Sequence, residues 1–379
     1  MEPKIRFKGF EGEWKASTIG EFCSVSIGEF VIKTKQNDNA PYPVYNGGSS
    51  YTGFYENYNQ EGPKVIVSAR GANAGFVNYC EKNFWAGNSC YSIATKDNRN
   101  LKFLYHCLKK NQSNYLNNQQ AANIPSISKK DIQETILVMP KSFEQQAIAS
   151  YFTSLDSQIS ACTSRLASLK QMKAASLQAM FPQEGETVPK IRFKGFEGEW
   201  KKVKFKDFGH VTMCKRIFKN QTTSEGDVPF YKIGTFGSEP DSYISQSLFE
   251  EYKKKYPFPN KGDILISAAG TIGRTVEYNG ENCYYQDSNI VWLDHNNNII
   301  NGFLKQLYSI VKWSSLEGAT IKRLYNSNIL ETTFYIPNIN EQQAIASYFT
   351  SLDRQISLQS QRLEKLKQIK SACLDKMFV

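Results

Sequence analysis

The sequence contains only three histidines among its 379 residues, and none of them lies in a metal-ligand or catalytic-triad pattern. Its eight cysteines are scattered and form no C-x-x-C pair, so we expect neither a zinc site nor a disulfide framework. A phosphate-binding G-x-x-x-x-G-K-[ST] loop, a glycine-rich cofactor loop and an Asn-Pro-Pro-aromatic motif are all missing. These absences predict a chain with no catalytic residues, no metal and no cofactor of its own.

Long apolar runs are also missing: no stretch of about 18 apolar residues occurs, so we expect no membrane-spanning segment. The first residues, MEPKIRFKGF, are charged and lack an apolar core, which argues against a signal peptide. Together with the unpaired thiols, this predicts a cytoplasmic protein. Lys and Arg number 46 against 36 Asp and Glu, and the net charge of +10 favours a polyanionic partner, with nucleic acid first and an acidic membrane surface second.

One short pattern imitates a nuclease motif. Pro240-Asp241 followed by Glu251-Tyr252-Lys253 resembles the PD…ExK pattern of metal-dependent nucleases. That motif needs a strand, whereas SLFEEYKKKYPF around Glu251 favours a helix or loop, and the first half of the chain has no counterpart. An autonomous nuclease is therefore the least favoured hypothesis.

The dominant feature is an internal repeat, which is the first signal to seek in a chain of this length. The segment PKIRFKGFEGEWK at residues 3–15 recurs unchanged at 189–201. The segment EQQAIASYFTSLDSQIS at 144–160 recurs at 341–357 with one substitution. Identical surfaces should meet identical partners, so the repeated segments predict docking of two copies of one protein. The alternative is a tandem duplication whose copies only pack together.

The stretches between the repeated segments have diverged while keeping a common skeleton. YPVYNGG lies over VPFYKIG, VIVSARG over ILISAAG, and SISKKDIQETILVMP over RLYNSNILETTFYIP. Short β-rich runs (KVIVSA, CYSIAT, DILISA and NIVWL) alternate with helical stretches near 101–110 and 302–313. We expect two compact mixed α/β domains that share one fold and differ at their surfaces.

Each second segment opens a long helix with an apolar 4-3-4-3 spacing, which is the heptad seam of coiled coils. The seam residues are Ile148, Phe152, Leu155, Ile159, Cys162, Leu166 and Leu169 in the first copy, and Ile345, Phe349, Leu352, Ile356, Gln359, Leu363 and Leu366 in the second. A helix from near Gln145 to Phe181 would span roughly 55 Å at 1.5 Å per residue. We expect the two helices to pair with each other; the alternative is that each packs on its own domain.

This layout resembles the specificity (S) subunit of type I restriction–modification systems. The resemblance rests on the Pro-x-x-x-E-Q-Q-x-I helix starts, the paired long helices and the two diverged domains preceded by PKIRFKGFEGEWK, and it covers essentially the whole chain. The expected fold class is α+β: a pseudo-two-fold tandem repeat of two mixed α/β target-recognition domains joined by two long antiparallel coiled-coil helices. The expected divisions are recognition domain 1 at 1–143, a central conserved helix at 144–183, recognition domain 2 at 184–340 and a C-terminal conserved helix at 341–379.

The resemblance implies a non-catalytic, sequence-specific DNA-binding subunit. Each recognition domain reads one half of a bipartite, asymmetric site in double-stranded DNA, and the helices set the spacer between the halves. The conserved regions dock two modification (M) subunits, which bind S-adenosylmethionine, and restriction (R) subunits that use ATP and Mg join them. A protein-only scaffold without a DNA role is the alternative, and salt-dependent binding to duplex DNA separates the two.

No family motif fixes the base contacts, so the candidate DNA-binding residues are chosen by chemistry: amides, hydroxyls and cations in loops. In the first domain they are Asn46, Ser49, Ser50, Tyr51, Arg70, Asn73, Asn88, Gln119, Gln120 and Asn123. In the second they are Lys215, Arg216, Lys232, Thr235, Arg274, Gln286, Lys322 and Arg323. The alternative is that the Asn and Ser side chains cap turns and that the cations are simply solvated.

One matched position gives a sharper hypothesis. Where the first half carries NIPS before its closing strand, the second carries IKRL. Amides suit adenine and cations suit guanine, so we predict that the half-site of the second domain makes more guanine contacts.

Overall fold

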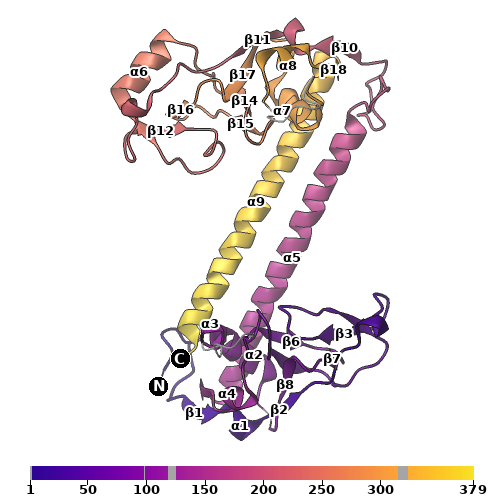
Figure 1. Cartoon of the computed structure of the whole chain (residues 1–379), viewed down its shortest axis with the longest axis vertical. Helices are drawn as coiled ribbons and strands as arrows, with labels where there is room; N and C mark the ends of the chain where they lie inside the picture. Colours follow the sequence, from indigo (N-terminus) through magenta and orange to yellow (C-terminus); the bar gives the residue numbers. More distant parts are fainter. Residues whose placement is uncertain (1, 98, 118–124, 315–322) are drawn as a thin grey trace. The chain divides into compact units, whose positions relative to one another are not determined.

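The computed structural model describes residues 2–97, 99–117, 125–314 and 323–379 (Figure 1). The chain divides into two compact units. Unit 1 comprises Met1–Ser164 and Ser360–Val379, and unit 2 comprises Arg165–Gln359. Each unit therefore combines one variable stretch with parts of both long helices, α5 (Ser142–Met180) and α9 (Ile339–Met377).

Unit 1 contains a four-stranded antiparallel sheet in the order β2-β8-β5-β6, a three-stranded sheet β4-β3-β7 and a two-stranded sheet β1-β9. Its strands are β1 (Lys15–Thr18), β2 (Cys23–Ile27), β3 (Tyr42–Tyr45), β4 (Gly53–Tyr55), β5 (Lys64–Ser68), β6 (Val77–Cys80), β7 (Trp85–Ala86), β8 (Cys90–Thr95) and β9 (Ile136–Met139). Its shorter helices are α1 (Ile19–Phe22), η1 (Lys33–Lys35), α2 (Leu101–Lys110), α3 (Gln112–Asn117) and α4 (Lys129–Gln133).

Unit 2 repeats this plan with sheets β11-β17-β14-β15, β13-β12-β16 and β10-β18. Its strands are β10 (Lys201–Lys204), β11 (Gly209–Thr212), β12 (Val228–Tyr231), β13 (Tyr243–Ile244), β14 (Ile264–Ser267), β15 (Thr275–Glu277), β16 (Tyr284–Tyr285), β17 (Ile290–His295) and β18 (Thr333–Ile336). Its shorter helices are η2 (Phe205–Asp207), η3 (Lys219–Gln221), α6 (Gln246–Lys255), α7 (Asn301–Ile310) and α8 (Asn326–Glu331). The matching strand orders confirm that both variable stretches share one mixed α/β fold.

One inner strand of each four-stranded sheet, β5 or β14, is buried on both faces, which explains its unbroken apolar run. In β5, Val65 and Val67 point into the main core of unit 1, whereas Ile66 faces a second cluster with Phe84. In β14, Ile266 lies in the main core of unit 2 and Leu265 in a second core. Apolar residues are therefore required at successive positions rather than at alternate ones.

Two helices of unit 1 begin where the sequence supplies caps. Asn100 accepts a hydrogen bond from the backbone N–H of Phe103 at 2.9 Å and so starts α2. Ser128 and Asp131 form a reciprocal capping box at α4. In α2, Phe103 and Leu104 are buried in the core, so the predicted helix at 101–110 is found with the same bounds.

The long helices lie side by side and antiparallel within each unit. In unit 1, Asp156 of α5 pairs with Lys370 of α9, and Tyr151 contacts Cys373. In unit 2, Lys173 pairs with Asp353. The predicted seam residues are buried or half-buried, and α5 begins three residues before the predicted start and ends one residue before the predicted end. The α+β fold class with paired antiparallel helices is confirmed.

The last residues of each long helix complete a core. Phe378, after α9, packs in unit 1 against Phe103 and Phe152 with ring centroids 5.4 and 5.6 Å away. Phe181, after α5, packs in unit 2 against Phe303 at 5.4 Å. Each unit is thus closed by the end of a helix that begins outside it.

Among the described residues, no helix is both long and apolar enough to span a membrane.

Candidate nucleic-acid interface

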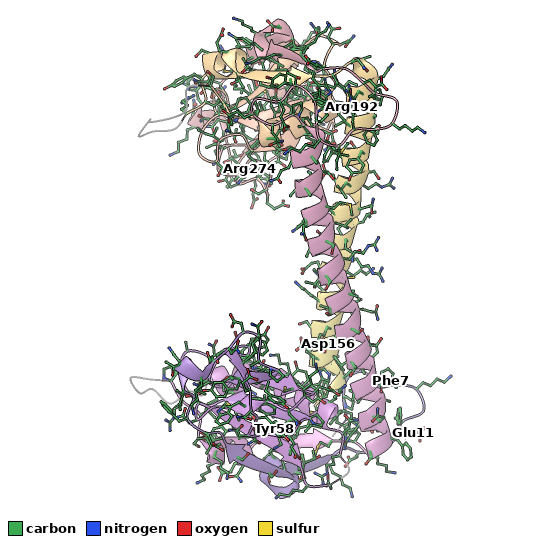
Figure 2. All side chains as sticks on the ribbon, turned by 90° about the vertical axis from the view of Figure 1, so that its right-hand side faces the viewer. Phe7, Glu11, Tyr58, Asp156, Arg192 and Arg274 are labelled. Carbon is green, nitrogen blue, oxygen red and sulfur yellow. The ribbon has the colours of Figure 1, made fainter. Side chains whose placement is uncertain are left out.

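The repeated segments are attached to the long helices by the same contacts in both units. The guanidinium of Arg6 donates to both carboxylate oxygens of Glu144 at 2.7 Å. Arg192 does the same to Glu341 at 2.6 and 2.7 Å, and Figure 2 shows Arg192 beside α9. Both carboxylates are buried, and the hydrogen bonds raise the pKa of each arginine. Charge-assisted bidentate bonds of this kind fix geometry as well as adding stability.

The first glutamine of each E-Q-Q motif joins the long helix to the recognition fold. The side chain of Gln145 accepts the backbone N–H of Asn100 at 3.2 Å and donates to the carbonyl of Pro140 at 2.9 Å. In unit 2, Gln342 makes the matching bonds to Ile300 and Pro337. The motif is therefore structural at its first two positions.

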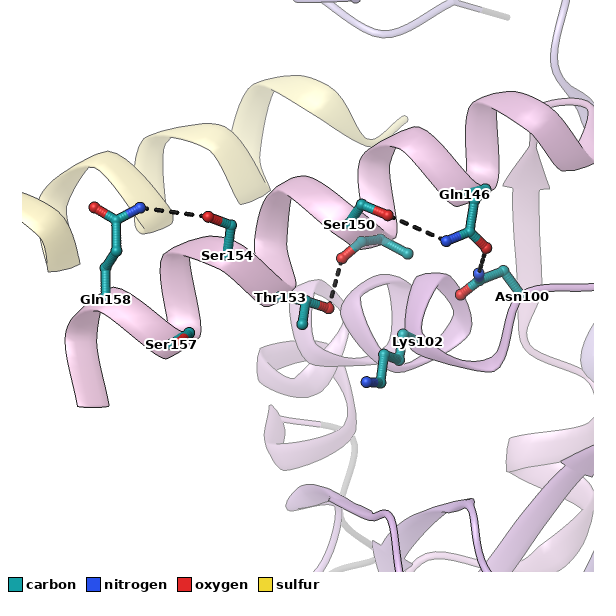
Figure 3. Close-up of a pocket in the computed structure, with 9 residues that line it drawn as sticks. Asn100, Lys102, Gln146, Ser150, Thr153, Ser154, Ser157 and Gln158 are labelled. Carbon is teal, nitrogen blue, oxygen red and sulfur yellow. Dashed lines mark hydrogen bonds between the residues drawn. The ribbon is translucent and has the colours of Figure 1, made fainter. Parts of the chain in front are cut away.

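The third position and the residues that follow are exposed. Figure 3 shows a shallow polar groove along α5 in which Gln146 donates to Ser150 at 3.1 Å and accepts from Asn100 at 2.6 Å. In unit 2, Gln343 donates to Ser347 at 3.3 Å. Residues 146–154 of α5 and 343–351 of α9 therefore present the same exposed side chains at the start of each long helix.

Loops from separate parts of unit 1 meet in one place, which we call the unit 1 loop cluster: the loops after β3, β5 and β7 and the segment before α4. The hydroxyl of Ser68 donates to the carbonyl of Gly48 at 2.8 Å. The backbone N–H of Ala69 donates to Ser89 at 2.8 Å, and that of Gly71 to Pro125 at 2.9 Å. Main-chain bonds thus hold together loops far apart in the sequence.

Close approach in this cluster requires glycine at position 47. Gly47 has a φ of +76°, and a Cβ there would lie 2.9 Å from the carbonyl oxygen of Arg70. Either feature disfavours a side chain.

The unit 1 loop cluster collects most of the first-domain candidates. Ser49, Ser50, Tyr51 and Arg70 are exposed, and Asn46, Asn73 and Asn88 are half-buried. The side-chain oxygen of Asn46 accepts the backbone N–H of Ser89 at 3.1 Å, so part of this amide serves the loop itself. Gln119, Gln120 and Asn123 lie outside the described residues.

Equivalent loops form the unit 2 loop cluster, after β12, β14 and β16 and before α8. The backbone N–H of Ala268 donates to Asn289 at 2.7 Å, and that of Leu324 donates to Ala268 at 2.8 Å. The side-chain oxygen of Gln286 accepts the backbone N–H of Ile233 at 2.9 Å. The cluster is therefore tied by main-chain bonds in the same manner as in unit 1.

Two predicted arginines converge on this cluster. Arg216 donates from Nε to Asp287 at 2.9 Å, and Arg323 donates from Nη2 to the carbonyl of Ser288 at 3.1 Å. Lys232 pairs with Asp241 at 2.8 Å and lowers the pKa of that carboxyl.

The remaining second-domain candidates have other surroundings. Thr235 accepts the backbone N–H of Lys232 at 3.1 Å and so closes a turn. Arg274 donates to the carbonyl of Phe236 at 2.6 Å, so its guanidinium holds a turn of the fold. Lys215 lies over the ring of Tyr256, 5.1 Å from its centroid. Lys322 lies outside the described residues.

The sequence-based selection missed two groups of residues. Asp287 and Ser288 hold the arginines, but their partners are distant in sequence. Lys253, Lys254 and Lys255 end α6, an exposed helix of unit 2 without a counterpart in the order of the described strands and helices of unit 1. The run of three lysines in the sequence was the signal for this surface.

The nuclease-like pattern forms no joint site. Asp241 pairs with Lys232, whereas Glu251 pairs with Lys255 at 2.9 Å within α6. Glu251 therefore lies on a helix, as expected, and not on the strand that the motif needs. In the part of the chain that the structure describes, no group of three or more His, Cys, Asp or Glu side chains could hold a metal.

Comparison with known proteins agrees with this architecture. The family model for the type I restriction modification DNA specificity domain matches residues 11–171 and again 197–368. A putative type I restriction enzyme specificity subunit of Haemophilus influenzae is 38% identical over 346 residues, covering 90% of this chain and 87% of the relative.

Solved structures share the fold. The crystal structure of a type I restriction-modification S subunit from M. genitalium has a TM-score of 0.77 at 19% identity and covers 100% of this chain and 99% of that one. A chain from a study of complex assembly and conformational transition of the type I R-M system has a TM-score of 0.53 at 15% identity, with 97% and 98% covered.

Family matches in both halves, together with the 38% identical relative, confirm the resemblance drawn from the repeats. They also confirm the prediction of a specificity subunit rather than a catalytic one. The chain belongs to the family of the type I restriction modification DNA specificity domain and carries that domain twice.

Proposed function

We propose that this chain selects the DNA sequence for a type I restriction–modification complex. Recognition domain 1 (residues 1–143) reads one half-site of double-stranded DNA and recognition domain 2 (184–340) the other. The pair of loop clusters supports this proposal, because matching main-chain hydrogen bonds hold different side chains in each unit. A shared backbone arrangement that carries different side chains suits two domains that read different bases.

The long helices would set the spacer between the half-sites. Each contains 39 residues, which corresponds to about 58 Å of helix at 1.5 Å per residue. A continuous helix has no hinge, so it can hold a fixed separation where a loop cannot. This role rests on the length and continuity of α5 and α9.

The repeated surfaces would dock two M subunits, one on each long-helix start. Gln146, Ser150 and Ser154 are exposed, and Gln343, Ser347 and Ser351 repeat them. The M subunits would bring S-adenosylmethionine for adenine methylation, and R subunits would bring ATP and Mg in the cytoplasm. This chain would supply position and specificity only.

Docking can be tested by placing bulky cations on one surface at a time. Ser150→Arg with Ser154→Arg should remove one M subunit from the complex, and Ser347→Arg with Ser351→Arg should remove the other. Native mass spectrometry reads the stoichiometry directly. Two M subunits retained in both variants would contradict docking at these surfaces.

DNA binding is tested with the purified chain–M complex and a fluorescent duplex. We expect the logarithm of the binding constant to fall linearly with the logarithm of salt concentration, with a slope of about −0.9 per phosphate contact. The alternative, a protein-only scaffold, predicts no salt-dependent binding of duplex DNA. That result would remove the main support for a DNA-reading role.

A further inference from the structure

Two arginines of unit 2 are anchored on neighbouring residues of one loop. Arg216 donates from Nε to a carboxylate oxygen of Asp287 at 2.9 Å. Arg323 donates from Nη2 to the backbone carbonyl of Ser288 at 3.1 Å. Because Asp287 and Ser288 are consecutive, both guanidiniums are held at the same part of the unit 2 loop cluster.

The loop that holds them is itself constrained. The backbone N–H of Gln286 donates to Tyr231 at 2.9 Å, and its side chain accepts the N–H of Ile233 at 2.9 Å. Ser288 has a φ of +53°, a left-handed conformation that non-glycine residues seldom adopt. A loop fixed in this way can hold a side chain in a defined direction before a ligand arrives.

The bond to Asp287 leaves the end of the Arg216 side chain available. The bond to Asp287 uses Nε of the guanidinium. The two terminal amino groups, Nη1 and Nη2, point away from Nε and can donate to a ligand. The Arg216 side chain is 60% exposed, whereas that of Asp287 is 17% exposed. A half-buried acid therefore steadies an exposed, forked donor, and a forked donor matches the O6 and N7 acceptors of guanine.

Unit 1 carries other residues at the matching positions. By the alignment of β2 with β11, Phe30 stands where unit 2 has Arg216, and its ring is 72% exposed. Ser126 stands where unit 2 has Arg323, since the following residues, Ile127 and Leu324, make the same bonds to Ala69 and Ala268. The anchored arginines therefore belong to one half of the molecule.

We propose that Arg216 and Arg323 are the guanine-reading side chains of the second recognition domain, with Asp287 as the positioning residue for Arg216. This inference rests on the proposed function and deepens it, because it names the base type and the half-site. Each arginine contacts one guanine in the major groove. The half-site read by unit 1 has no equivalent pair.

The test uses the chain–M complex and duplex libraries randomised within the site that the wild-type complex methylates. Arg216→Ala should reduce the preference for guanine at one position by about tenfold or more, and Arg323→Ala should do so at a second position. Both changes should fall in the same half-site and leave the other half unaltered. Lys202→Ala, which removes an exposed charge from β10, serves as the charge-matched control.

Two further variants separate base reading from charge and from folding. Arg216→Lys keeps the charge and loses the fork, so overall affinity should remain while the guanine preference falls. Asp287→Ala should weaken the preference at the Arg216 position only, and Asp287→Glu should restore part of it. If Asp287→Ala caused only a structural defect, glutamate at position 287 would not be expected to restore the guanine preference.

Three outcomes overturn the inference: a half-site without guanine, equal loss of methylation on all sequences in Arg216→Ala, or full guanine preference in Arg216→Lys. The second would assign the arginine to phosphate contact. Failure of the proposed function looks different, because the wild-type complex itself would then show no bipartite sequence preference.

Discussion

The two recognition folds differ in what matching backbone positions carry. Asn46 in unit 1 corresponds to Lys232 in unit 2, and Ser126 corresponds to Arg323. The main-chain bonds around these positions stay the same: Ala69 bonds to Ser89 at 2.8 Å, and Ala268 bonds to Asn289 at 2.7 Å. The fold can therefore change its surface chemistry without changing the loops that present it.

Unit 2 also carries an element that has no counterpart among the described residues of unit 1. Helix α6 ends in three lysines and packs beside η3, where Gln221 donates to Tyr252 at 3.4 Å. In Figure 1, α6 lies at the edge of unit 2 near β12 and β16. Cations on this helix extend the charged surface of one half only, so the difference between the units is electrostatic as well as chemical.

The largest effect is expected at the two phenylalanines that complete the cores of the two units. Phe378→Ala should destabilise unit 1 and Phe181→Ala should destabilise unit 2, each by about 3–5 kcal/mol, because both rings are buried among aromatic neighbours. Hydrogen exchange read by mass spectrometry should show reduced protection in one unit for each variant. Protection reduced equally in both units by either substitution would contradict closure of each core by one helix end.

A second prediction concerns the helices common to both units. One heptad inserted after Ser160 of α5, and another after Lys365 of α9, should lengthen the preferred spacer by about 3 base pairs, from 1.5 Å per residue and 3.4 Å per pair. Both half-sites should be unchanged in the methylated motif. Seven residues inserted after Gly185, in the turn beyond α5, are the control and should leave the spacer as it is. Altered half-sites with an unaltered spacer would show that the helices do not set distance.

A third prediction concerns the lysines at the end of α6, which belong to unit 2. Replacing Lys253, Lys254 and Lys255 with alanine should weaken duplex binding on all sequences and reduce the salt slope by about 1 for each phosphate that these lysines neutralise. The methylated motif should stay the same, because phosphate contacts carry no sequence information. A changed motif with an unchanged salt slope would place these lysines at bases instead.

The smallest predicted effect involves one buried position. His106 in α2 is 2% exposed and corresponds to Gln306 in α7. Burial, with smaller contributions from Lys370 and Lys102, lowers the pKa of His106 to about 3. The unfolded chain binds a proton below about pH 6.5 and the folded chain does not, so stability falls as the pH drops from about 6.5 towards 3.

The expected decrease in stability is about 1.4 kcal/mol per pH unit below pH 6.5. His106→Gln, which copies unit 2, should remove this slope from the unfolding of unit 1 in denaturant titrations at pH 7 and pH 5. An unchanged slope in the variant would mean that another group causes the acid sensitivity.

Periodicity and repeats were sufficient to predict the architecture. The apolar runs at β5 and β8, the amphipathic α2 and the heptad seam each depend on residues close in sequence. Copies of the same segment at 144–160 and 341–357 added the pairing of the helices. These signals are local or repeated, so one sequence reveals them.

The site could be predicted only in part. Arg216 and Asp287 are 71 positions apart, and nothing in the sequence links them. Conversely, Arg274 looks like a candidate from its type, yet its guanidinium is used by the carbonyl of Phe236. Tertiary contacts decide which cationic side chains remain available for DNA, and residue type alone does not reveal those contacts.

Mapping methylated adenines tests directly whether the two recognition domains each read one half-site. The chain is co-expressed with its M subunit, and the genome is sequenced with a long-read method that detects methylation. We expect a bipartite motif with a fixed gap that disappears without this chain. A single contiguous motif, or no new methylation from a folded chain–M complex, would contradict two domains that each read a half-site.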